Sequence, residues 1–197
     1  MGKYSKANLI DDELSLIGTT TLFGKILHKL NKSSIIILSI QVPLTLYLRA
    51  EVFCEDVQDL SDMEFVQNDL MNLLYNDFLH YVKKNPDPQS ILGMLTSLER
   101  QGGRNTNLER QTESVFKMVQ KNNHQDMQPL HLRMRRKFAL RGEVLLADLE
   151  EIQPKHGYTL ERVFELLYID FIDKLRKGDN VEAMNTILRI LDNEEDT

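Results

Sequence analysis

Two segments of this sequence carry a tyrosine followed two residues later by an aspartate, a combination that could support acid–base or metal chemistry. Tyr75 and Asp77 lie in LLYNDFLHYVKK, and Tyr168 and Asp170 lie in LLYIDFIDKLRK. Facing each other, the aspartates could act as an acid–base pair or hold a metal ion, but helical metal sites normally add a Glu-x-x-His pattern or further inward carboxylates. None appears. We expect both aspartates on the polar surface, and a catalytic pocket around these four residues remains an alternative.

The remaining nucleophilic and metal-binding residue types show no catalytic spacing. The histidines form no HExxH motif and no i, i+4 pair, and the sequence has no GxSxG, GxxxxGK[ST] or GxGxxG motif. Cys54 is the only cysteine, so it can form neither an internal disulfide nor a CxxC pair. We expect it to be a small core residue rather than a nucleophile. The sequence therefore favours a non-enzymatic protein without cofactor or metal.

A basic segment, LHLRMRRKFALR, is the one local electrostatic feature. On a helix several of its cations would share a face, which could contact phosphates or an acidic protein. The other interpretation is a solvated basic face paired with Glu109, Glu113, Glu143 or the C-terminal acids. No interleaved aromatic residues suggest base stacking. The candidate contacts to an acidic partner or phosphate are Arg133, Arg135, Arg136, Lys137 and Arg141.

Composition narrows the class of protein. The 197 residues are 42% hydrophobic and 27% charged, as in soluble globular proteins, and the formal net charge of −6 argues against a broad nucleic-acid surface. The longest apolar stretch, 34–48, contains Gln41 and Pro43 and falls short of the roughly 20 residues of a spanning helix. With no secretory signal visible, we expect a cytoplasmic protein without a membrane span.

The N-terminal region predicts an antiparallel β-hairpin at about 33–54. Residues 35–42 form an apolar run, residues 44–53 alternate between apolar and polar, and Pro43 would mark a bend between two strands. If a strand edge of this hairpin is the docking surface, its candidate contacts are Ile35, Ile37, Tyr47 and Phe53.

Downstream, helical spacing and capping residues predict a bundle of five or six helices. The expected N-caps are Ser61 with Glu64, Asp87 before Pro88, Thr106 with Glu109, and Thr159. A further helix is expected from about 127 to 149, and the turn KGDN leads into a last helix. The resulting helical hairpins span 61–101 and 159–193.

The two hairpins look related. A shift of 93 residues aligns 73–98 with 166–191 and gives eight identities. Among them, Tyr75 aligns with Tyr168 and Asp77 aligns with Asp170. We interpret this as a duplicated structural unit rather than a chemical motif.

Together these patterns predict a mainly helical α+β protein in a single compact domain (1–197). Its expected sub-regions are a strand-rich 1–57, one hairpin copy at 58–101, intervening helices at 102–156 and a second copy at 157–197. The expected function is that of a docking or regulatory protein, adaptor-like or chaperone-like, that binds another protein, further copies of itself as a homo-oligomer, or both. The alternatives are a nucleic-acid-binding regulator that uses 133–141, and an enzyme lacking known motifs with a pocket between the hairpins.

Overall fold

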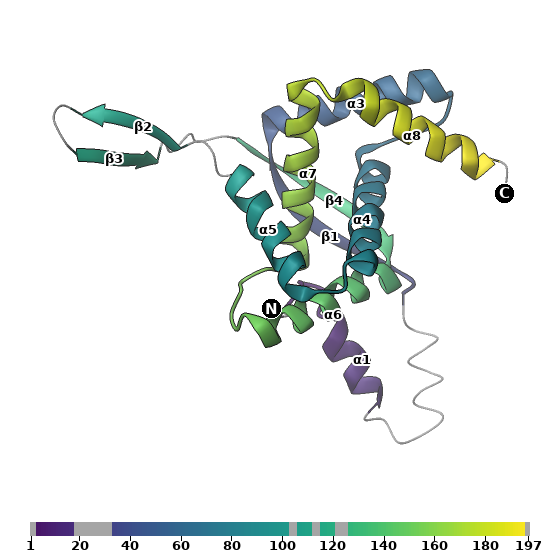
Figure 1. Cartoon of the computed structure of the whole chain (residues 1–197). Coiled ribbons are helices and arrows are strands. Elements are labelled where there is room, and N and C mark those ends of the chain that lie inside the picture. The colour runs from purple at the N-terminus through teal and green to yellow at the C-terminus, as the bar shows by residue number, and fades with distance from the viewer. Residues whose placement is uncertain (1–2, 18–32, 103–105, 112–114, 121–125, 196–197) are drawn as a thin grey trace.

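The computed structural model describes residues 3–17, 33–102, 106–111, 115–120 and 126–195. Helices dominate it, so the mainly helical α+β class is confirmed (Figure 1). Its elements are, in order, α1 (Leu9–Ile17), β1 (Ile35–Pro43), α3 (Leu44–Ser61), α4 (Gln67–Lys84), α5 (Pro88–Gly102), β2 (Thr106–Gln111), β3 (Val115–Gln120), β4 (Met127–Arg135), α6 (Arg136–Ile152), α7 (Leu160–Lys177) and α8 (Asn180–Glu195).

An antiparallel strand pair that includes β1 is present, but its second strand is β4, not residues 44–53. The register pairs Ile36 with Met134 and Leu38 with Leu132, and these side chains are buried beneath the sheet. Odd-numbered residues of both strands point the other way. The even-numbered apolar positions therefore fix the register, because a slip of one residue would expose them all.

The prediction of a strand over 44–53 is wrong, because these residues begin the helix α3. Leu44, Leu48 and Val52 fit a period of two, but they also fit a helical spacing of four. The buried positions of α3 are Ala50, Phe53, Cys54 and Val57, which is helical spacing. The described residues of 1–57, namely 3–17 and 33–57, are therefore mostly helical rather than strand-rich, and β1 is the one strand among them.

Two other helix predictions are wrong. Residues 127–135 form β4, where Leu130, Leu132 and Met134 alternate with exposed residues, and the helix α6 begins only at Arg136. Residues 106–111 and 115–119, expected to be helical from the Thr106 capping box, form β2 and most of β3, an antiparallel pair that projects away from the helices (Figure 1). Strand pairing at distant positions outweighs the local helical signal in β4.

The remaining helix boundaries follow local capping, with one correction. Asp87 accepts hydrogen bonds from the backbone N–H groups of Gln89 and Ser90 at the start of α5, and Thr159 accepts from the N–H of Arg162 in α7, as predicted. Ser61 does not cap α4. It ends α3, and α4 instead begins where the side chain of Asp69 accepts from the N–H of Val66.

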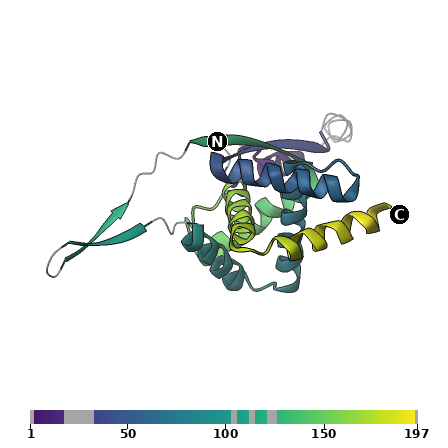
Figure 2. The ribbon, with the colours of Figure 1, turned by 90° about the horizontal axis from the view of Figure 1, so that it is seen from above.

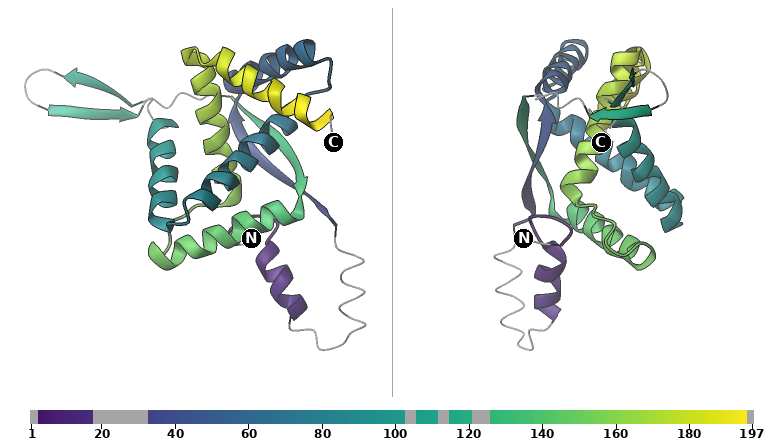
Figure 3. Two further views of the ribbon diagram at one scale, coloured as in Figure 1. Left: turned by 45° about the vertical axis from the view of Figure 1, so that its right-hand side comes forward. Right: turned by 90° about the vertical axis from the view of Figure 1, so that its left-hand side faces the viewer.

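The helix α7 lies at the centre of the molecule, where it packs against β1, α3, α4 and α5 (Figures 1 and 3). The aromatic rings of Tyr75 in α4 and Phe164 in α7 meet edge to face, with 4.7 Å between centroids. Helix pairs α4/α5 and α7/α8 occupy the two predicted hairpin positions, but α5 packs against α6 and α7, whereas α8 packs against α3 and α7. Their common origin stays a prediction.

Candidate functional site

The β1–β4 sheet has one face covered by helices and one face open (Figure 2; Figure 3, right). On the open face, Ile35 lies opposite Arg135 and Ile37 lies opposite Arg133. The isoleucines are 42% and 66% exposed, and both arginines are exposed as well. Positive charge continues onto the first turns of α6. We call the four exposed cations Arg133, Arg135, Lys137 and Arg141 the basic face.

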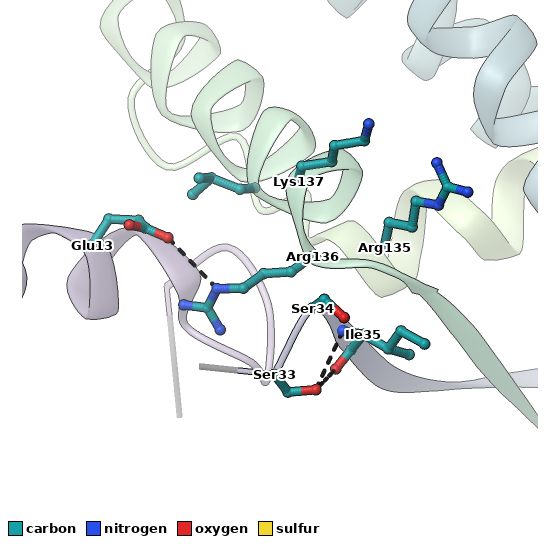
Figure 4. A pocket seen from close by; sticks show the side chains of 8 residues that line it. Glu13, Ser33, Ser34, Ile35, Arg135, Arg136 and Lys137 are labelled. Atoms are coloured by element: carbon teal, nitrogen blue, oxygen red, sulfur yellow. Dashed lines mark hydrogen bonds and ion pairs between the residues drawn. The ribbon is translucent and has the colours of Figure 1, made fainter. Parts of the chain in front are cut away.

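Arg136 does not belong to the basic face, contrary to the predicted shared helical face. The boundary between β4 and α6 falls immediately before it, so its side chain turns toward α1 and is only 13% exposed. There it forms ion pairs with Asp12 and, at 3.5 Å, with Glu13 (Figure 4). Arg136 thus fixes α1 against the rest of the molecule and is not available to a partner.

The charges of the basic face are not neutralised within the described part of the chain. None of its four cations has a carboxylate oxygen within 4.0 Å there, and Glu143, an expected partner, is buried elsewhere. The side chains of Glu109 and Glu113 lie outside the described residues. The ring of Phe138 lies 5.0 Å from Lys137 Nζ and 5.8 Å from the Arg141 guanidinium, so cation–π contacts orient these two groups.

Two hollows flank the pair formed by Ile35 and Arg135. One, of about 560 Å³, lies toward α1 and is lined by Ser33, Ser34 and Lys137 in addition to that pair (Figure 4). The other, of about 490 Å³, lies toward α4 and reaches Phe138. Glu13 also lines the first hollow, where it pairs with Arg136. Both hollows combine other cationic groups with apolar ones, so each can receive an acidic side chain or the apolar residue next to it.

Asparagines of α4 hold the outer edge of β4 in place beside the basic face. The backbone N–H of Arg133 donates to Asn68 Oδ1 at 2.7 Å, and Asn72 Nδ2 donates to the carbonyl oxygen of Arg133 at 3.3 Å. Asn76, one turn further, lines the second hollow. The sequence analysis missed these residues, although asparagine at every fourth position of a predicted helix was a visible signal.

The predicted strand-edge contacts divide into two groups. Ile35 and Ile37 are exposed on β1, whereas Tyr47 and Phe53 lie on α3 and belong to no strand. Phe53 is only 5% exposed, and its ring packs edge to face on Phe171. The opposite edge of β1 is also partly engaged, since the N–H of Gln41 donates to Glu165 Oε1. The open face of the sheet therefore offers more contact surface than its edges.

A buried carboxylate connects the N-terminal segment to the helices. Glu143 of α6 is 1% exposed and accepts hydrogen bonds from the hydroxyl of Ser5 and from the backbone N–H groups of Leu9 (3.1 Å) and Ile10 (2.9 Å). These N–H groups belong to the first turn of α1, which has no partner for them within the helix. Glu143 thus caps α1 from another helix and helps to place its acidic residues beside Arg136.

The two tyrosine–aspartate pairs do not come together to form a site. They are Tyr75 with Asp77 and Tyr168 with Asp170. The hydroxyl of Tyr75 donates to the carbonyl oxygen of Phe138, and that of Tyr168 donates to Gln67 Oε1 at 2.7 Å. Burial raises the pKa of both tyrosines, so they stay protonated and act as hydrogen-bond donors. Asp77 is exposed, and Asp170 forms an ion pair with Lys174. The repeated tyrosines have structural roles, and this geometry gives no support to a shared catalytic pocket.

The Cys54 thiol is buried in the core. Burial, with smaller contributions from Glu51, Asp69 and Glu55, raises its pKa to about 12. We expect Cys54 in the native protein to react with a thiol reagent at pH 8 at least about a hundredfold more slowly than in urea, because the thiolate is scarce and covered. Absorbance-monitored labelling with a disulfide reagent measures both rates; equal rates would contradict the buried assignment.

No cluster of three or more His, Cys, Asp or Glu side chains suited to a metal ion occurs in the described ranges. In the same ranges no helix has the length and apolar character needed to cross a membrane. Comparison with protein-family models, curated proteins and solved structures yields no match for this chain. Functional inference therefore depends on the surfaces described above.

Proposed function

We propose that this protein is a non-enzymatic docking protein that binds an acidic segment of a partner protein across the open face of the β1–β4 sheet. One observation carries the proposal: the basic face, whose four exposed cations have no carboxylate partner in the described part of the chain, adjoins the exposed side chains of Ile35 and Ile37. Charge complementarity between the basic face and the acidic segment would orient the partner, and burial of the isoleucine side chains would stabilise the complex.

The mixed character of the surface favours a protein segment over nucleic acid. Nucleic-acid surfaces in general bring several cations to the phosphates and often aromatic rings to the bases. Here isoleucines stand directly opposite the arginines of β4, and the adjacent ring of Phe138 is covered by Lys137 and Arg141. A segment in which acidic and apolar side chains alternate would satisfy both kinds of contact.

The test measures fluorescence anisotropy of a labelled peptide composed of Glu, Asp and Leu. We expect the wild-type protein to bind it with a Kd in the micromolar range, and the double variant Arg133→Glu/Arg135→Glu to bind at least about tenfold more weakly. A peptide with Gln and Asn in place of Glu and Asp should bind about as weakly as the variant does.

The matched control is Lys83→Glu/Lys84→Glu, which makes the same charge change at exposed positions at the end of α4. It should leave the affinity within about twofold of wild type. If both double variants weakened peptide binding equally, the effect would come from the overall charge of the protein, and a specific binding site on the basic face would be contradicted. Tighter binding of duplex DNA than of the peptide, lost with Arg133→Glu/Arg135→Glu, would replace this proposal with the nucleic-acid alternative.

A further inference from the structure

A second exposed surface lies on α3, at the other end of β1 from the basic face. Leu48 and Val52 are each 56% exposed, although they stand one turn apart on the same side of this helix. Between α3 and α8, which lie side by side (Figures 1 and 3), there is a groove of about 410 Å³. Phe53, Leu175 and Met184 contribute to its lining. This groove and the helix beside it form an apolar surface that no described segment covers.

The groove has one cation and one anion at its rim. Arg49 and Asp56 both line it, both are exposed, and neither forms an ion pair within the described residues. They are seven residues apart, which is two turns of helix, so they share one side of α3. Positive charge therefore lies on one side of Val52 and negative charge on the other.

We propose that α3 pairs with α3 of a second copy of this chain, antiparallel about a two-fold axis that passes between Val52 and Phe53, midway between Arg49 and Asp56. Such an axis places Arg49 opposite Asp56 of the partner subunit, and by symmetry Asp56 opposite Arg49 of the partner subunit. Leu48 and Val52 would then extend into the groove between α3 and α8 of the partner subunit. A parallel arrangement would instead bring like charges together, so the charge pattern selects the antiparallel one.

The dimensions agree with a modest dimer interface. The 18 residues of α3 extend over about 27 Å, and Val181 at the start of α8, 72% exposed, adds apolar surface beside the groove. The nine residues of β1 separate this interface from Ile35 and the basic face. The dimer therefore leaves both basic faces open, and this inference does not depend on the proposed function.

The test is a charge exchange read by native mass spectrometry and sedimentation velocity of the full chain. We expect a concentration-dependent wild-type dimer with a Kd below about 100 μM. Arg49→Asp alone and Asp56→Arg alone should each weaken the dimer at least about tenfold, and the double variant Arg49→Asp/Asp56→Arg should restore it to within about threefold of wild type. Circular dichroism checks that each variant is folded.

A second measurement places the axis directly. Val52→Cys should form a disulfide-linked dimer under mild oxidation, whereas Leu60→Cys, 64% exposed on the same helix but two turns away, should not. Buried Cys54 contributes no cross-link in either variant. A monomer at all concentrations up to about 100 μM, single variants that dimerise like wild type, or failure of the double variant to recover would each overturn the proposal.

Discussion

Replacing Gly142 by alanine is expected to lower the free energy of unfolding by about 2–3 kcal/mol, in the upper part of the range of about 1–3 kcal/mol seen when a well-packed core is overfilled. Alanine is normally the better helix former, by about 1 kcal/mol, so an ordinary position in α6 would give the opposite sign. At Gly142, however, a Cβ atom would stand 2.2 Å from the hydroxyl oxygen of Tyr75 and 2.7 Å from Leu160 Cδ1. Urea denaturation followed by circular dichroism gives the value.

The Tyr75 hydroxyl is the nearer obstacle, which allows a double-mutant cycle. In the Tyr75→Phe background the oxygen is absent, although Leu160 Cδ1 remains, so Gly142→Ala should cost at least about 1 kcal/mol less than it does in wild type. Gly93 of α5 is the matched control, because a Cβ there would meet nothing within 4 Å. Gly93→Ala should leave the stability unchanged or raise it. Additive effects of the two substitutions at Gly142 and Tyr75 would contradict the steric explanation.

Replacing Glu143 by alanine is expected to cost about 3 kcal/mol, because three donors lose their acceptor in a buried site. These donors are the Ser5 hydroxyl and the N–H groups of Leu9 and Ile10. The effect should be largest in α1, where hydrogen exchange of the Leu9 and Ile10 amides should accelerate before the core opens. Denaturation reports the global stability, and hydrogen exchange on the same sample reports whether α1 detaches locally from the rest of the protein.

Two companion variants of Glu143→Ala make this expectation specific. Glu143→Gln keeps the shape but turns one acceptor into a donor, so it should cost about 1–2 kcal/mol. Glu151→Ala, at an exposed position later in α6, should change stability by less than about 0.5 kcal/mol. If Glu143→Ala left the exchange of the α1 amides unchanged, the capping role would be wrong.

Features encoded by neighbouring residues were predictable, and features that depend on distant pairing were not. Thr159 and Asp87 cap their helices as expected, because a cap is satisfied within its own first turn. The strand β4 was taken for a helix because its character comes from β1, whose Ile36, Leu38 and Ile40 lie opposite it. The alternation of Leu130, Leu132 and Met134 with polar residues is a local strand signal, but nothing near it identifies β1 as the partner strand.

The candidate site shows the same division. Arg133, Arg135, Lys137 and Arg141 were identified from the basic segment, and all four are exposed in the structure. The separation of Arg136 depends on where strand gives way to helix, a boundary that single-sequence patterns locate poorly. The regular spacing of the α4 asparagines was visible in the sequence, but their role was overlooked because the β4 backbone groups that they contact leave no signature there.

The pairing of β1 with β4 also has a consequence for folding. Pro43 pairs with Met127, so the whole stretch that contains α3, α4 and α5 lies between the two strands in the chain. Helices of this kind form from local contacts, whereas the sheet requires closure of a long loop and is therefore expected to form late. Because Arg133 and Arg135 lie on β4 while Ile35 and Ile37 lie on β1, the proposed binding surface, which combines the basic face with these isoleucines, is assembled only when that loop closes. Binding at this surface would thus distinguish a fully folded chain from an incomplete one.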